Sequence, residues 1–178
     1  KKNLNINDYD YVIITNNIIN IFFNKYKDIT SKIVLYTNAL YTKNYLNVIE
    51  LYDKHIDTYI TVNEESKELL SKFNKNIIVS INKNKIIPLG LTRCLNILSN
   101  IKFKSLYITG VTFYKNKNLK ECYENNYIVK EGLFYNIFNK NIPSVHNIYS
   151  DFLYTKKFCQ RANVMMCPEL ISIMRNTK

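Results

Sequence analysis

Short apolar runs separated by helix-length segments constrain the fold of this chain most. Six such runs lie at residues 11–15, 32–37, 57–62, 77–81, 105–109 and 163–166. Their apolar residues are mostly continuous rather than alternating, which is typical of strands covered on both faces of a sheet. The segments between them predict helices over 42–54, 64–73, 91–100 and 151–162. Asn63 and Ser150 are the predicted N-caps of the second and fourth helices.

The alternation of strands and helices predicts an α/β fold. We expect a Rossmann-like, mostly parallel sheet with flanking helices and right-handed crossovers. With 178 residues, 47% of them hydrophobic, the chain can build one well-packed domain spanning residues 1–178. No apolar run approaches the roughly 18 residues of a membrane helix. Residues 111–145 are the longest segment without a predicted element, and such segments are often functional lids or binding loops.

The formal net charge of +11 has two interpretations. A polyanionic partner, such as nucleic acid or a nucleotide, would explain it. A very AT-rich genome would explain it equally, because Lys, Ile, Tyr, Phe and Asn, which occurs 27 times, all have AT-rich codons. The lysines are scattered along the sequence rather than gathered on one helix face, which favours the second interpretation.

The four cysteines, Cys94, Cys122, Cys159 and Cys167, all lie in the second half of the sequence. They show no Cys-x-x-Cys spacing, and the chain has only two histidines, so we expect no structural zinc site. A disulfide between the two halves cannot form. Reduced, partly buried thiols are the expectation, and they favour an intracellular reducing compartment.

In an open α/β sheet, ligands bind beyond the carboxyl ends of the strands. This rule identifies the residues that follow the predicted strands: Asn16, Asn17, Asn38, Asn63, Gly90 and 110–114. The amide of Asn16 can hold a ribose or a base.

Two glycines mark further candidate nucleotide contacts. Gly90 and Thr92 lie in a turn before a helix, where free backbone N–H groups favour a phosphate, although an ordinary turn has the same pattern. Gly110 permits close backbone approach, and Tyr114 could stack on a nucleobase. A turn glycine beside core aromatics is the alternative for that pair.

His146 is the first candidate for chemistry. It precedes a predicted helix, and Asp151 follows five residues later, in the first turn of that helix. A carboxylate there can orient the imidazole and raise its basicity, so that His146 could take a proton from an acceptor hydroxyl. The alternative is that His146 packs locally and that Asp151 only favours a helix N-terminus.

Two other patterns are not assigned to chemistry. Asp8-Tyr9-Asp10 has the form of a metal-binding Asp-x-Asp, but it precedes its strand and so lies at the amino edge of the sheet. His55 is expected to start a strand and to have a surface or core position. We therefore expect no metal site.

Taken together, these segments resemble the sialyltransferase family of eukaryotic type, including its short bacterial and giant-virus relatives. Residues 10–16, Asp-Tyr-Val-Ile-Ile-Thr-Asn, with residues 32–35 resemble the later half of the family's long motif. Residues 88–113 resemble its short motif, and His146 with Asp151 resembles its very short motif. The order and approximate spacing agree over most of the chain.

The resemblance implies the glycosyltransferase A variant of the Rossmann-like fold. It also implies an inverting, metal-independent transfer of a sialic acid-like sugar from a CMP-sugar donor to a glycan hydroxyl, with no further cofactor. In that reaction His146 would be the base, Asp151 its orienting partner, and Asn16 a nucleotide contact. We expect Gly90, Thr92, Gly110 and Tyr114 to contact the nucleotide as well.

The chain also departs from the family's pattern. Ile14 stands where the family usually has Arg, Asp151 replaces the commoner Glu, and Tyr123 or Tyr127 stands nearest to a third motif that normally contains His. The Gly-rich opening of the long motif would lie upstream of Lys1. These departures and the charge motivate an alternative function: a catalytically inactive sialyltransferase-like domain that serves as a structural or RNA-associated subunit of a larger assembly.

Overall fold

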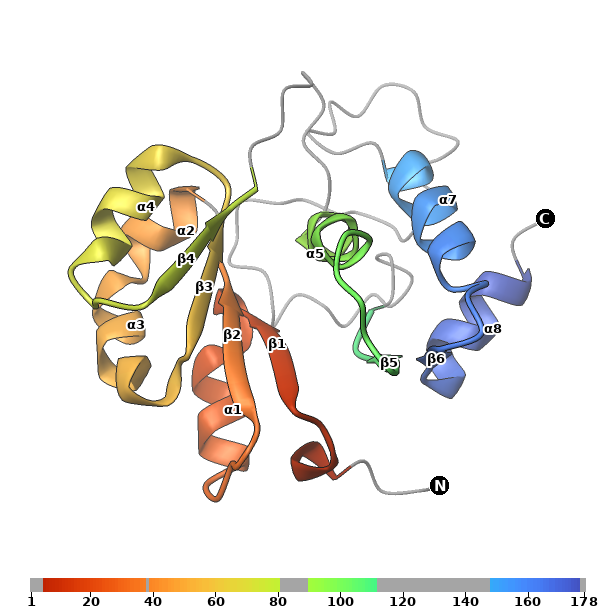
Figure 1. The fold of residues 1–178 in the computed structure, drawn as a ribbon, viewed down its shortest axis with the longest axis horizontal. Helices are drawn as coiled ribbons and strands as arrows, with labels where there is room; N and C mark the ends of the chain where they lie inside the picture. The colour runs from red at the N-terminus through yellow and green to blue at the C-terminus, as the bar shows by residue number, and fades with distance from the viewer. Residues whose placement is uncertain (1–4, 38, 81–89, 112–147, 177–178) are drawn as a thin grey trace. The chain divides into compact units, whose positions relative to one another are not determined.

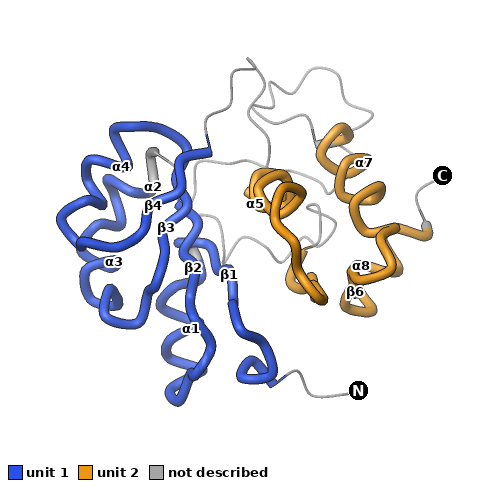
Figure 2. The backbone as a smooth tube through the Cα atoms, viewed as in Figure 1, with its two compact units in different colours: residues 1–83 blue, residues 84–178 orange. Residues whose placement is uncertain are grey.

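The computed structural model of the chain describes residues 5–37, 39–80, 90–111 and 148–176. It consists of two compact units, Lys1–Lys83 and Asn84–Lys178 (Figure 2). Each unit is described by itself below.

The first unit contains a four-stranded, fully parallel sheet in the order β1-β2-β3-β4. Its strands are β1 (Tyr11–Thr15), β2 (Lys32–Tyr36), β3 (Thr58–Thr61) and β4 (Asn76–Val79). The main helices between them are α1 (Ile19–Lys25), α2 (Ala39–Asn44), α3 (Leu46–Tyr52) and α4 (Glu64–Ser71). Every crossover advances by one strand in the same direction, so right-handed crossovers place all these helices on one face of the sheet. In Figure 1, α2, α3 and α4 stand together on one side of the strands.

Apolar side chains from alternate strand positions hold this layer together. Ile14, Leu35 and Tyr59 lie next to one another in the strand register and belong to one buried cluster with side chains of the covering helices. The helices contribute Phe22, Phe23, Ile49 and Leu70. The strand positions between these, Val34, Tyr36 and Ile60, are buried as well, at 8%, 6% and 3% exposure. The central strands are therefore covered on both faces, as their continuous apolar sequence predicts.

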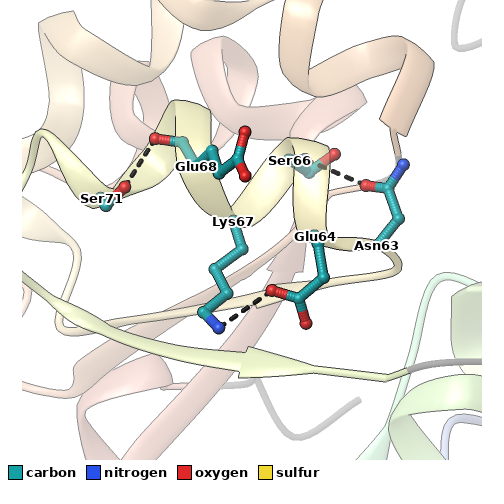
Figure 3. Close-up of polar contacts among 6 residues, drawn as sticks. All are labelled: Asn63, Glu64, Ser66, Lys67, Glu68 and Ser71. Atoms are coloured by element: carbon teal, nitrogen blue, oxygen red, sulfur yellow. Dashed lines mark hydrogen bonds and ion pairs between the residues drawn. The ribbon is translucent and has the colours of Figure 1, made fainter.

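Helix α4 begins at the predicted cap. The Asn63 side chain accepts a hydrogen bond from the backbone N–H of Ser66 at 3.0 Å (Figure 3). Glu64, in the first turn, forms an exposed 2.9 Å ion pair with Lys67. Acidic residues at this end also interact favourably with the helix dipole. The sequence therefore determines this helix start locally.

The second unit contains a pair of parallel strands, β5 (Leu106–Ile108) and β6 (Val164–Met166). Its helices are α5 (Gly90–Leu98), α7 (Ile148–Phe158) and α8 (Pro168–Asn176). One buried cluster joins all five elements through Leu95, Ile108, Phe152, Val164 and Leu170. Among the residues described in either unit, no helix has the length and apolarity to cross a membrane.

All six predicted strands are confirmed, with ends that differ by at most two residues. The parallel sheet of four strands flanked by helices is consistent with the predicted Rossmann-like class. The six strands are, however, hydrogen-bonded into two sheets, of four and two strands. A strand's apolar sequence indicates that it is buried but does not select its neighbour, which is why the sequence did not predict this division.

The helix predictions are less accurate. The helix expected over 42–54 is two helices and a 3-10 turn; the break falls at Tyr45, whose φ of −110° and ψ of 14° are not helical. His55 ends that turn instead of starting a strand. Ser150 lies inside α7, which begins at Ile148, so the predicted cap is wrong. The sequence interpretation also missed α1 and α8, which follow β1 and β6 after very short connections.

The burial of α4 predicts a contrast between two leucines. Leu70→Ala should lower the free energy of unfolding by about 2–5 kcal/mol, because Leu70 is fully buried and truncation leaves a cavity. Leu51→Ala, the same change on α3 at a side chain 65% exposed, should cost less than about 0.5 kcal/mol. Chemical denaturation of both variants measures the difference, and equal losses would contradict the placement of α4.

Candidate functional site

The carboxyl ends of β1, β2 and β3 meet at one edge of the first sheet. The register pairs Thr15 with Tyr36 and Tyr36 with Ile60, so the residues that come next, Asn16, Thr37 and Thr61, lie on adjacent strands. All three are buried, at 4%, 0% and 0% exposure. A row of buried polar side chains therefore closes the apolar core at the edge where parallel sheets bind ligands.

Among the described residues, hydrogen bonding at this edge of the sheet is incomplete. Thr37 is joined to Thr42 of α2 by a 2.9 Å bond between their hydroxyl oxygens. By contrast, the Nδ2 atom of Asn16 and the hydroxyls of Thr61 and Ser66 are buried without a hydrogen-bond partner in the described part of the chain. An unpaired buried polar group typically costs about 1–3 kcal/mol, so native structures usually satisfy it by water, by protein or by a ligand. Asn16 thus combines the predicted position with an unused donor.

Four other predicted site residues lie in the second unit: three predicted nucleotide contacts and Asp151, the predicted orienting partner of the base. Gly90 and Thr92 form the first turn of α5, and Gly110 directly follows β5. Asp151 lies in the first turn of α7. Since α5 and α7 each lead into the amino end of a strand and pack against each other, their first turns lie toward the carboxyl ends of β5 and β6. The packing of Leu91 and Val111 against one shared cluster supports this arrangement.

Polar and charged groups are buried around these two first turns. The Thr92 hydroxyl and that of Thr155, one turn after Asp151, have no hydrogen-bond partner within the described residues. Arg93 and Asp151 are only 6% and 4% exposed, and neither lacks an interaction partner. Buried charges are retained only where they are paired or hydrogen-bonded, so this end of the second unit is more polar than its core requires.

Gly110 has a backbone that other residues adopt rarely. Its φ of +72° lies in the left-handed region, and an added Cβ would meet no atom within 4 Å. Conformation rather than space therefore selects glycine there. The predicted turn glycine is confirmed, while a contact to nucleotide stays a prediction.

The predicted site residues are divided between the two units and the part of the chain that the structure does not describe. His146 and Tyr114 lie outside the described residues, as does Asn38. Asn16 belongs to the first unit, whereas Gly90, Thr92, Gly110 and Asp151 belong to the second. The residues that sequence reasoning missed are Thr37, Thr42, Thr61 and Ser66. A threonine directly at the end of an apolar strand was the available signal for two of them.

The described thiols of the second unit are buried, and two of them are held in the neutral form. Cys94, Cys159 and Cys167 are buried and free, as predicted, and Cys122 lies outside the described residues. Burial raises the pKa of Cys94 to about 12 and that of Cys159 to about 11, so neither forms a thiolate at neutral pH. These cysteines serve as core residues.

The amino end of the first sheet has a surface hollow, and the metal-binding patterns weighed in the sequence can also be located. In the described ranges, no three His, Cys, Asp or Glu side chains gather closely enough to hold a metal. A polar surface hollow lies at the amino end of β2, lined by residues that include Ser31, Lys54, His55 and Asp57. The His55 ring there packs at 5.4 Å from Phe23. Asp8 lies in a 3-10 turn before β1, at the amino edge as predicted.

Comparisons with protein-family profiles, with curated proteins and with solved structures found no match. The functional assignment therefore rests on the site itself and on the sequence pattern.

The backbone of Gly110 predicts a graded effect of substitution. Gly110→Ala should lower the free energy of unfolding by about 1–2 kcal/mol, because alanine pays the left-handed penalty without any compensating contact. Gly110→Asn should cost less, since asparagine tolerates this region better. Urea titration of the two variants gives the comparison; identical stability of Gly110→Ala and the unmodified protein would be inconsistent with the φ described.

Proposed function

We propose that the chain binds a CMP-sugar and transfers its sugar, a sialic acid-like residue, to a hydroxyl of a glycan acceptor. The observation that carries the proposal is the buried Nδ2 atom of Asn16 at the carboxyl end of β1, which has no hydrogen-bond partner among the residues that the structure describes. That is the position at which open parallel sheets bind nucleotides. The sequence around it, residues 10–16, carries the resemblance to the long motif.

Asn16 would recognise the nucleotide through hydrogen bonds. Its amide nitrogen can donate to an oxygen of the ribose or of the cytosine ring. Because the side chain is only 4% exposed, this bond would form away from bulk water and would discriminate strongly against analogues without the acceptor.

The departing CMP would need its phosphate charge stabilised. The first turn of α5 offers free backbone N–H groups, and Gly90 lets a phosphate approach them closely. The buried hydroxyl of Thr92 in the same turn is a further donor without a partner in the described chain. Gly110 and Tyr114 are the proposed contacts from the segment after β5. Donors fixed in advance stabilise developing charge without reorganisation, which lets such a reaction proceed without a metal ion.

The acceptor hydroxyl would be activated by His146. The imidazole takes the hydroxyl proton while the oxygen attacks the anomeric carbon, and CMP leaves from the opposite face with inversion. Asp151, buried in the first turn of α7, is the proposed orienting partner of this base. A carboxylate in a poorly solvated position favours the imidazolium that forms during the transfer.

Nucleotide binding can be tested by thermal unfolding with CMP. At a tenfold excess over the dissociation constant, CMP should raise the melting temperature by roughly 3–6 °C, and AMP should raise it less. Asn16→Ala should abolish most of that rise. The stability of the free protein should be unchanged or slightly higher, because the change removes a buried amide nitrogen that has no partner in the described part of the chain. Asn20→Ala, at an exposed position of α1, is the matched control and should keep the full CMP effect. No shift with CMP in the unmodified protein would refute the proposal.

Catalysis can be tested with the two histidines of the chain. His146→Ala should reduce transfer from CMP-sialic acid by about 10²–10⁴-fold, the usual contribution of one general base. His55→Ala changes an exposed histidine at the amino end of the sheet and should leave turnover intact. Asp151→Asn should lower turnover by a smaller factor than His146→Ala. Equal activity of His146→Ala and His55→Ala would remove the base from the mechanism.

A further inference from the structure

The positive charge of the chain is unevenly distributed. The first unit, Lys1–Lys83, contains 11 Lys and Arg against 9 Asp and Glu. The second, Asn84–Lys178, contains 14 Lys and Arg against 5 Asp and Glu. Nearly all of the net charge therefore belongs to the second unit.

Two segments of the second unit meet at the amino ends of its parallel strands. Residues 99–105 lead into β5, and residues 159–163 lead into β6. Asn163 donates from Nδ2 to the carbonyl of Phe103 at 3.0 Å, and its own carbonyl accepts from the N–H of Leu106 at 2.9 Å. The rings of Phe103 and Phe158 stack at 6.4 Å. These contacts fix the two segments side by side.

Four exposed cations lie on these two segments and in the last turn of α7, which leads into the second of them. Lys102 and Lys104 flank Phe103, while Lys157 and Arg161 lie at the end of α7 and in the loop after it. We call these four residues the amino-end basic cluster. Neither residues 99–105 nor residues 156–163 contain an acid. In the described part of the second unit, the acids are Asp151, which is buried, and Glu169, which follows β6 at the opposite end of the strands.

The guanidinium group of Arg161 stacks on an aromatic ring. Its guanidinium carbon lies 4.1 Å from the centre of the Phe158 ring. Stacking on an aromatic face restrains the guanidinium and leaves the N–H groups at its rim for a phosphate, which it can bind in a bidentate manner.

Helix stabilisation explains only part of the cluster. Lys157 lies in the last turn of α7, where a cation interacts favourably with the helix dipole. Lys102 and Lys104 lie outside any helix, and the helix dipole therefore does not explain their positive charge. Two separate segments that carry cations and, in the described part of this unit, no exposed acid beside them are the pattern expected of a polyanion site.

We propose that the amino-end basic cluster binds the phosphate backbone of a nucleic acid. An anionic membrane is the less suitable partner, because surface-bound proteins insert an apolar face and Ile101 is the one large, exposed apolar side chain described on these two segments. The site lies at the opposite end of β5 and β6 from Gly110 and is independent of the proposed nucleotide-sugar site.

Binding can be measured by fluorescence anisotropy with a labelled single-stranded RNA of about 20 nucleotides. If the four cations each neutralise one phosphate, the affinity should fall by about 50-fold between about 50 and 200 mM salt. A DNA of the same sequence should bind similarly, since the contacts are to phosphates. The variant Lys102→Glu/Lys104→Glu should bind RNA at least about tenfold more weakly and should show a smaller salt dependence.

The matched control makes the same change of charge in the first unit. Lys27→Glu/Lys43→Glu, at two exposed positions, should change the RNA affinity by less than about twofold. Equal weakening by both double variants would mean a diffuse attraction and would overturn the site, as would the absence of RNA binding. Binding to phosphatidylserine vesicles without binding to RNA would overturn it in favour of a membrane partner.

Two further measurements show whether the charge-reversed variant is folded and whether the CMP site is affected by the same change. If circular dichroism shows that the reversed variant is unfolded, the neutral Lys102→Gln/Lys104→Gln and the single Lys157→Glu replace it, and each should weaken binding by several fold. The CMP-induced thermal shift should be the same in Lys102→Glu/Lys104→Glu as in the unmodified protein. In the unmodified protein, RNA binding without a CMP shift would refute the transferase proposal and leave this one standing, whereas a CMP shift without RNA binding would refute this one alone.

Discussion

The burial of β2 on both faces is the constraint from which the arrangement of the first unit follows. Ile33 and Leu35 point to the helix-covered face and are at most 1% exposed, while Val34 and Tyr36 between them are also buried. The parallel neighbours of β2 are reached through crossover connections, and in this unit those connections are the helices that cover one face of the sheet. Parallel pairing in turn brings every carboxyl end to one edge, so the position of the candidate site follows from the packing of the core.

In the described residues, the polar groups at the two ends of this sheet differ in their hydrogen bonding. At the amino end, polar groups are satisfied within the chain: Tyr59 donates to Asp53 at 2.6 Å, and Asp57 accepts from the N–H of Ile33 at 2.9 Å. Burial, with help from Asp53, raises the pKa of Tyr59 far above its ordinary value, so this hydroxyl remains a donor. At the carboxyl end, Asn16 and Thr61 retain unpaired atoms within the described residues. Among the described residues, the unpaired polar atoms of this sheet therefore lie at its carboxyl end.

The sequence predicts the repeating parts of this structure well. Continuous apolar runs located all six strands, and Asn63 with two following acids located the start of α4, because these signals are local. Helix α1 follows its strand after only a 3-10 turn, and α8 starts at Pro168, close to the end of β6. Both helices were missed because no loop separates them clearly from the strand before them. The division into two sheets depends on which strands pair, which no local pattern encodes.

The candidate site was predictable to the same extent. Asn16 was identified because the rule about strand ends needs only the location of a strand. The buried partners Thr37 and Thr42 were missed, since a hydrogen bond between β2 and α2 depends on how that helix packs. Asp151 was located correctly near the start of α7, although its burial could not be read from a single helix.

Codon bias explains the number of lysines in the chain but not the distribution of its net charge. An AT-rich genome raises lysine throughout, and both units are rich in it. What distinguishes the second unit is its scarcity of acids, five against nine, in a segment that is longer than the first. Bias toward lysine codons does not remove acids, and it does not choose neighbours in space. Lys104 and Lys157 are far apart in the sequence, but the pairing of β5 with β6 and the bonds of Asn163 bring their segments together. Strand pairing therefore brings cations from separate parts of the sequence onto neighbouring segments, which composition alone does not show.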